Sequence, residues 1–191
     1  MKREEGALQQ ERVSLFRTVI GMMISPAGAL KSALSGKRWY LSIVVSVLAF
    51  GLFFLQTGLD LYKTGQKDFS FVFVALGTGA AYGLVVIPLV AVFIWIILKA
   101  ARIEETMFQV VSAFCLSYSG ALIYGIIGTI VSLTLGWKTA VAFGVTGVVW
   151  AVGPMMYTIR ELTNGKTYLS IFISAVVGLA VLVSWGYLGN L

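Results

Sequence analysis

Within the apolar segments of this sequence, the polar side chains are mainly the hydroxyls of Ser, Thr and Tyr. These hydroxyls could bind a ligand or form hydrogen bonds between helices. Among those within the long apolar runs, the candidates for lining a cavity are Thr78, Tyr82, Ser117, Tyr118 and Tyr124. One interpretation is a neutral polar cavity, for a lipid, a peptide or a small solute, between the second, third and fourth apolar segments. The simpler interpretation is hydrogen bonding between helices, which contributes about 0.6–2 kcal/mol for each bond in a membrane.

The side chains that usually carry catalysis and metal binding are scarce. The 191 residues include no histidine, which is the commonest general base and the commonest metal ligand. The one cysteine, Cys115, lies within an apolar run, so no internal disulfide can form and no thiolate metal site is expected. The serine motif Ser117–Gly120 lacks the histidine base that an intramembrane serine protease requires. We therefore expect no enzymatic activity and no cofactor.

The composition is that of a membrane protein. Hydrophobic residues make up 59% of the chain and charged residues 12%, with a mean hydropathy of +0.93. The net charge is +6, but 7 of the 14 Lys and Arg residues lie in the first 38 positions, before the first long apolar run. This placement favours contact with lipid headgroups and a role in topology rather than binding of nucleic acid. We expect the lipid bilayer to be the main partner.

Five apolar segments predict an all-α integral membrane protein. They cover residues 39–59, 69–98, 107–135, 139–157 and 167–188, and an α-helix needs about 20 residues to cross the hydrocarbon layer. We expect residues 39–191 to form a five-span domain and residues 1–38 a cytoplasmic N-terminal segment. The spacing of apolar residues over Leu8–Met23 predicts an amphipathic helix, which either lies in the headgroup region or packs beneath the bundle.

Small residues recur at every fourth position in two of the spans. Such a ridge lets another helix approach closely. The alternative is that glycine and serine are simply common in membrane spans. The sequence is also compatible with an oligomer. We expect the second and third spans to cross at these ridges, with the third at the centre of the bundle. The ridge residues are Ala75, Gly79 and Gly83 in the second span and Ala113, Ser117, Ala121 and Gly125 in the third.

Local signals indicate where several helices begin, end or bend. Thr106 and Gln109 have the spacing of a capping box at the start of the third span, and Gly136 is a natural stop for it. Pro88 and Pro154 remove backbone hydrogen bonds and should bend or break the second and fourth spans. Asp60, near the end of the first span, is expected to face solvent.

The distribution of Lys and Arg predicts the orientation. With the N-terminus inside, the cytoplasmic segments 1–38, 99–105 and 158–166 hold 7 + 2 + 2 = 11 of these residues, against 3 outside. This predicts a plasma (inner) membrane protein with a cytoplasmic N-terminus and an external C-terminus. The charges on the cytoplasmic side form a candidate surface for another membrane protein or complex: Lys37, Arg38, Arg102, Glu104, Glu105, Arg160, Glu161 and Lys166.

Three stretches of the sequence resemble the Yip domain family, the Ypt/Rab-interacting proteins and their prokaryotic relatives. They are FRTVIGMMISPAGALKSALSGKRWYLSIVVSVLAF, ETMFQVVSAFCLSYSGALIYGIIG and MMYTIRELTNGKTYLSIFISAVVG. In the second stretch, Ser119-Gly120-Ala121 stands where the family usually has a proline shortly after its "Y-S" element. Five spans and a cytoplasmic N-terminus are also features of that family.

The resemblance implies a non-enzymatic membrane protein. Eukaryotic members of the family act in vesicle traffic with small GTPases, but the brief N-terminal region here does not support carrying that partner over. The leading hypothesis is a scaffold or accessory subunit that binds another membrane complex or organises the membrane. The alternative is a small-solute or lipid transporter with a neutral polar cavity between the second, third and fourth spans.

The charge distribution makes a direct prediction about the C-terminus. A cysteine placed at Asn190 should react with a membrane-impermeant reagent in intact cells, because 11 of the 14 basic residues then lie on the cytoplasmic side. Labelling that appears only after lysis would contradict this orientation.

Overall fold

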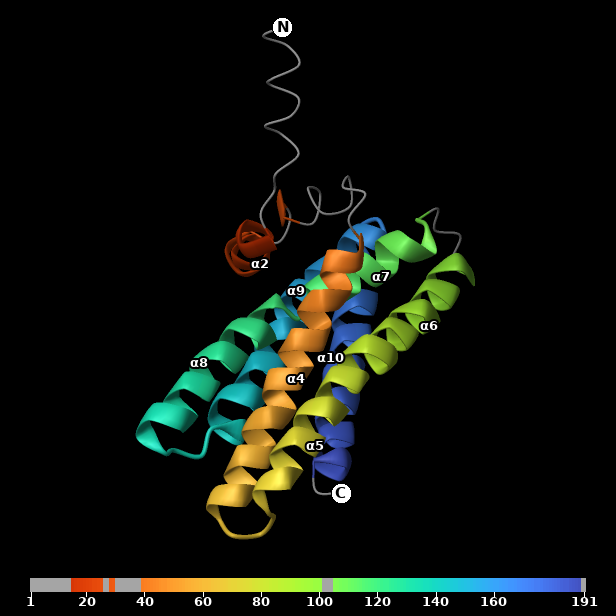
Figure 1. The fold of residues 1–191 in the computed structure, drawn as a ribbon. Coiled ribbons are helices and arrows are strands. Elements are labelled where there is room, and N and C mark those ends of the chain that lie inside the picture. Colours follow the sequence, from red (N-terminus) through yellow and green to blue (C-terminus); the bar gives the residue numbers. More distant parts are fainter. Residues whose placement is uncertain (1–14, 26–27, 30–38, 101–104, 190–191) are drawn as a thin grey trace, which may run out of the picture.

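The computed structural model describes residues 15–25, 28–29, 39–100 and 105–189, and these parts contain helices and no strand (Figure 1). Five helical segments are long and apolar enough to span a membrane: Tyr40–Lys63, Phe69–Ala100, Met107–Leu135, Ala140–Leu162 and Thr167–Leu188. The predicted all-α architecture with five spans is confirmed. The chain is accordingly described as a multi-pass membrane protein.

Three of the spans are made of more than one helical element. The first and fifth spans are the single helices α4 (Trp39–Lys63) and α10 (Thr167–Leu188). The second consists of α5 (Phe69–Ala81), the π-helical turn η1 (Tyr82–Val86) and α6 (Ile87–Ala100). The third is divided into α7 (Met107–Leu116) and α8 (Ser119–Leu135), and the fourth into η2 (Ala140–Val145) and α9 (Thr146–Leu162).

Helix α4 lies at the centre of the bundle, with α5 on one side and α8 on another (Figure 1). The glycines of both ridges face α4. A Cβ added to Gly79 would collide with the Phe50 carbonyl, and one added to Gly83 would collide with the Ser46 carbonyl. A Cβ on Gly125 would lie 3.0 Å from the Cβ of Leu52. The expected crossing of the second and third spans at their ridges is therefore wrong, since each ridge packs against the first span.

The remaining ridge residues are also buried, but against different neighbours. Ala75 lies beside Gly58 of α4, where an added Cβ would stand 3.0 Å from the Cβ of Ala75. Ala113 is fully buried. Ala121 faces the fourth span, because a Cβ on Gly147 would lie 2.9 Å from the Ala121 Cα. The second and third spans do meet, but through α6 and α7 rather than through the ridges.

The third span is interrupted at Ser117 and Tyr118, without a proline. The Ser117 hydroxyl donates to the Ala113 carbonyl at 3.1 Å, and the Ser119 hydroxyl donates to the Leu116 carbonyl at 2.7 Å. These bonds give partners to carbonyl groups beside the break. The predicted capping box of Thr106 and Gln109 is confirmed, and Gly136 ends α8 in the left-handed conformation with φ 70°.

The two prolines inside spans differ in effect. The turn η1 precedes Pro88, and within it the chain switches to longer hydrogen bonds, with the Ile87 N–H donating to the Tyr82 carbonyl. Helix α9 instead runs without interruption from Thr146 to Leu162 and includes Pro154. Of the two effects expected of Pro154, a bend or a break of the span, the break does not occur.

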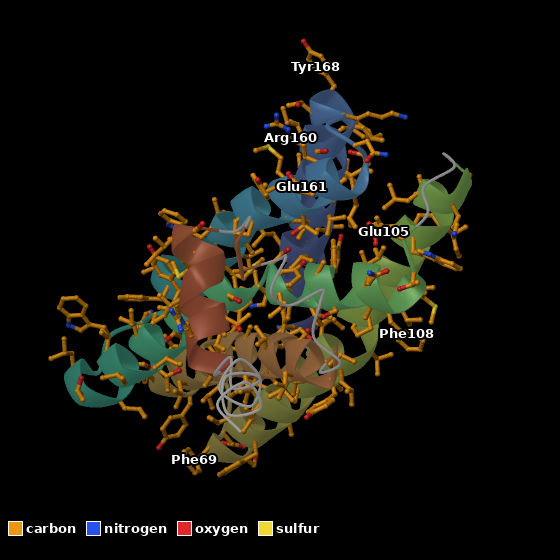
Figure 2. The ribbon with its side chains drawn as sticks, turned by 90° about the horizontal axis from the view of Figure 1, so that it is seen from above. Phe69, Glu105, Phe108, Arg160, Glu161 and Tyr168 are labelled. Atoms are coloured by element: carbon orange, nitrogen blue, oxygen red, sulfur yellow. The ribbon has the colours of Figure 1, made fainter. Side chains whose placement is uncertain are left out.

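The N-terminal amphipathic helix packs against the bundle. Of the predicted Leu8–Met23 helix, residues before 15 lie outside the described residues, and α2 (Leu15–Ile24) forms the rest. Val19 and Met22 are buried in the core, and α2 contacts α8. Figure 2 shows α2 from above, lying across the end of the bundle. Of the two placements expected from the sequence, the structure has the helix packed on the bundle.

The close approach to α4 predicts the effect of side chains added to the second span. Gly83→Leu should lower the free energy of unfolding by about 3 kcal/mol, because the leucine would meet the backbone of Ser46 and Val47. The measurement is the melting temperature in detergent. Gly77→Leu is the matched control, because nothing lies within 4 Å of a Cβ there. Equal melting of the two variants would contradict close packing at Gly83.

Candidate functional site

One end of the bundle is formed by the α4–α5 turn, the α8–α9 connection and the last residues of α10 (Figure 1). The last turns of α4 supply Thr57, Asp60 and Lys63 to this end. The orientation predicted from the charges makes it the external end. Within the described residues, we take this end as the candidate site because its side chains form several hydrogen bonds and line a pocket.

Asp60 holds the beginning of the fourth span. Its carboxylate accepts hydrogen bonds from the Thr139 N–H, at 2.8 and 3.1 Å, and from the Ala140 N–H at 2.8 Å. These are the first amides of η2, which have no partner within the helix. A negative charge is also favourable there, because the start of a helix is the positive end of its dipole. The expectation that Asp60 faces solvent is therefore wrong.

Lys63 binds the other side of the same connection. Its ammonium donates to the Ser132 carbonyl at 2.7 Å, the Ser132 hydroxyl at 2.6 Å and the Trp137 carbonyl at 3.0 Å. Carbonyls near the end of α8 lack helical partners and form the negative end of that helix dipole. We call Asp60 and Lys63 together the α4 clamp, because they hold the end of α8 and the start of η2 from one helix.

Trp185 fixes α10 to the same part of α4. Its indole N–H donates to the Thr57 hydroxyl at 2.9 Å, and its ring stacks on Phe53 with 5.0 Å between centroids and 23° between planes. The indole therefore has a single orientation at the bundle end. Sequence reasoning missed this contact, because 128 residues separate the two partners.

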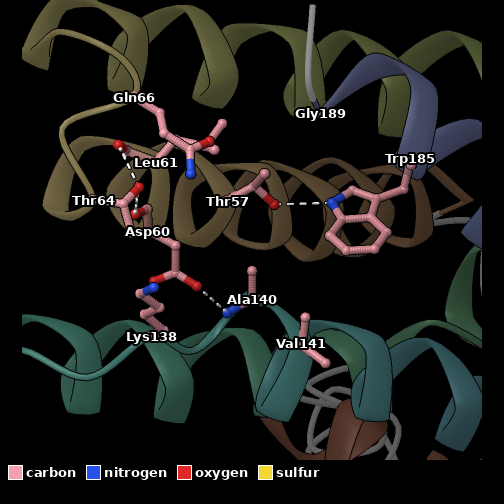
Figure 3. Close-up of a pocket in the computed structure, with 11 residues that line it drawn as sticks. Thr57, Asp60, Leu61, Thr64, Gln66, Lys138, Ala140, Val141, Trp185 and Gly189 are labelled. Carbon is pink, nitrogen blue, oxygen red and sulfur yellow. Dashed lines mark hydrogen bonds between the residues drawn. The ribbon is translucent and has the colours of Figure 1, made fainter.

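A pocket of about 310 Å³ lies between α4, the start of η2 and the end of α10 (Figure 3). Its charged groups are the Asp60 carboxylate and Lys138, and its apolar walls include Leu61, Val141 and Trp185. Thr57, Thr64 and Gln66 add neutral polar groups. The arrangement can bind a small ligand that carries both signs of charge. It offers no histidine, and the described residues contain no group of three or more side chains that could hold a metal ion.

The hydroxyls expected to line a cavity are placed elsewhere. Tyr82 bonds to the Ser184 hydroxyl at 2.6 Å, and Ser117 approaches the Thr158 hydroxyl at 3.3 Å. Tyr118 is buried against Phe50, with 4.9 Å between ring centroids, and its hydroxyl has no hydrogen-bond partner. Tyr124 stacks on Trp150 and Thr78 is half-buried. None of these five residues lines the pocket of Figure 3.

The expected cytoplasmic surface is only partly described. Lys37, Arg38, Arg102 and Glu104 lie outside the described residues. Arg160, Glu161 and Lys166 are exposed, whereas Glu105 is half-buried and its carbonyl accepts a bond from the Trp95 indole at 3.2 Å. Figure 2 shows Glu105 beside the start of α7 and Arg160 and Glu161 near the end of α9. These elements share the end of the bundle that carries α2.

Comparisons of the chain with protein-family models, curated proteins and solved structures gave no match.

The hydrogen bonds of the α4 clamp make a prediction about stability. Asp60→Ala should lower the free energy of unfolding by about 1–3 kcal/mol, because it leaves the Thr139 and Ala140 amides without an acceptor. Thermal unfolding in detergent measures the loss. The matched control is Asp68→Ala, since Asp68 precedes α5 without a side-chain capping bond. If the two variants unfold at the same temperature, Asp60 does not hold the fourth span.

Proposed function

We propose that this protein is a non-enzymatic scaffold or accessory subunit of the Yip family type, which binds another membrane complex or organises the membrane. In this proposal it resides in the inner membrane of a prokaryote with its N-terminus in the cytoplasm. The partner binds at the end of the bundle that carries α2, the start of α7 and the α9–α10 turn.

The observation that carries the proposal is the use of polar groups inside the bundle. Ser42 and Ser112 bond to each other at 2.5 Å, Ser46 donates to the Gly83 carbonyl at 2.8 Å, and Gln56 donates to the Gly125 carbonyl at 2.9 Å. Each of these bonds joins α4 to another span. Hydrogen bonds between spans occupy these polar groups, so they are not free to bind a substrate. We therefore place the binding function on the outer surface of the bundle.

The end with α2 has the features of a contact surface. Helix α2 is held in place by its buried residues Val19 and Met22, while Ile24 is 79% exposed. Exposed charges of α9 and the α9–α10 turn belong to the same end. Screened charge pairs on such a surface contribute only about 0–1 kcal/mol each to folding. These charges are therefore better suited to binding a partner or anionic lipid than to stabilising the fold.

A second candidate is a transporter of a small solute or lipid. It is favoured by the Tyr118 hydroxyl, which is buried in the bundle without a hydrogen-bond partner. Uptake of solute or scrambling of lipid by the purified protein in liposomes would support this candidate. Co-purification of one defined membrane complex from native membranes would support the scaffold.

Two sets of variants separate these functions. Glu105→Lys, Arg160→Glu and Glu161→Lys should leave melting nearly unchanged, because charges at the solvent-accessible end of the bundle are screened and contribute little to folding. The same variants should reduce recovery of the partner several-fold in a pull-down. Asp68→Lys, at the opposite end, is the control for a change of charge alone. Ser117→Ala and Tyr82→Phe should instead cost about 1 kcal/mol of stability and leave recovery unchanged.

The reverse pattern would contradict the scaffold. If the hydroxyl variants stay folded but lose the cellular phenotype, while the charge reversals have no effect, a ligand cavity inside the bundle becomes the better explanation.

A further inference from the structure

The pocket at the α4 clamp lies at one end of the bundle, where the spans end and the headgroups of a bilayer are expected. It is built from the last turns of α4, the first residues of η2 and the end of α10, where three membrane spans reach one surface of the bundle. Tyr62, Trp137 and Tyr187, at the ends of α4, α8 and α10, are exposed aromatic side chains. Tyrosine and tryptophan are enriched where hydrocarbon gives way to headgroups.

Asp60 provides a negative group with remaining capacity. An ionised carboxylate has about four lone-pair positions, and three contacts with the Thr139 and Ala140 amides occupy at most three of them. Oδ2 accepts both short bonds, whereas Oδ1 accepts only the longer contact of 3.1 Å. The carboxylate can therefore accept one more donor from the pocket, such as an ammonium group.

Lys138 provides the positive group. Its side chain is exposed at the rim, and the structure gives it no hydrogen-bond or ion-pair partner within the described residues. Lys63, the other lysine nearby, is already bound to the end of α8 through three contacts. Lys138 is therefore the cation with three donors left for a phosphate.

The walls of the pocket suit an amphipathic ligand. Trp185 is held by its bonds to Thr57 and by stacking on Phe53, so it offers a rigid aromatic surface, and an indole attracts ammonium groups. Val141 lines the pocket and is 70% exposed, which leaves an apolar path from the pocket to the outer face of the bundle. A pocket of about 310 Å³ is large enough for a headgroup.

We propose that this pocket binds the zwitterionic headgroup of a phospholipid. The ammonium group lies against Asp60 and Trp185, the phosphate bonds to Lys138, and the acyl chains leave past Val141. A soluble phosphoethanolamine compound carries the same two charges. The inference goes beyond the scaffold function, since it concerns the opposite end of the bundle and is tested on the purified chain without a partner.

The test is native mass spectrometry of the full chain in detergent, titrated with dioctanoyl phosphatidylethanolamine. The parent should bind it at least about fivefold more tightly than dioctanoyl phosphatidylglycerol, which lacks the ammonium group. Lys138→Gln should weaken binding about tenfold, the order expected for losing one charge-assisted hydrogen bond. Val141→Trp should weaken it at least as much by filling the pocket, and neither variant touches the α4 clamp. Lys166→Gln, at the other end, is the matched control.

Several results would overturn the proposal. Unchanged affinity in both Lys138→Gln and Val141→Trp would show that the lipid binds elsewhere. Equal binding of the two lipids would show that Asp60 and Trp185 do not recognise the ammonium group. If glycerophosphoethanolamine binds as tightly as the lipid, the pocket recognises the headgroup chemistry, but its ligand is a soluble compound rather than a membrane lipid.

Discussion

No water is available in the hydrocarbon layer, so every polar group that the spans carry into it needs a partner within the protein. This constraint explains much of the bundle. Helices satisfy their own backbone over most of their length, and the exceptions are their ends and interruptions. At those places side chains take over: Asp60 at the start of the fourth span, Lys63 at the end of the third, and Ser117 and Ser119 at the break between α7 and α8.

The same constraint accounts for the central position of α4. Without a strong hydrophobic force between helices in lipid, close packing and hydrogen bonds must join them. Helix α4 combines the two: the glycines of α5 and η1 bring backbones together at Phe50 and Ser46, and Ser42, Ser46 and Gln56 bond to neighbouring spans. Helix α4 therefore contacts the glycines of neighbouring spans and also forms hydrogen bonds with them, which makes it the helix against which the second and third spans pack.

The sequence predicted the features that depend on nearby residues. Five spans, the capping box at Thr106 and the end of α8 at Gly136 follow from composition and short spacings, and the structure has all of them. The partner of a ridge was not predictable, because a four-residue spacing defines a face of one helix and says nothing of which helix meets it. The role of Asp60 was missed for the same reason: its partners lie 79 and 80 residues further along the chain.

The distance in sequence between α4 and its partners also bears on how the protein is made. Helix α4 leaves the ribosome before every span that it contacts, carrying Gln56 and Asp60 towards the far side of the membrane. The acceptor for Gln56 is synthesised 69 residues later, and the amides for Asp60 come later still. Until the third span and the start of the fourth are made, Gln56 and Asp60 therefore lack the partners that they have in the finished bundle. The hydrogen bonds that join α4 to the later spans can therefore form only after those spans have been synthesised.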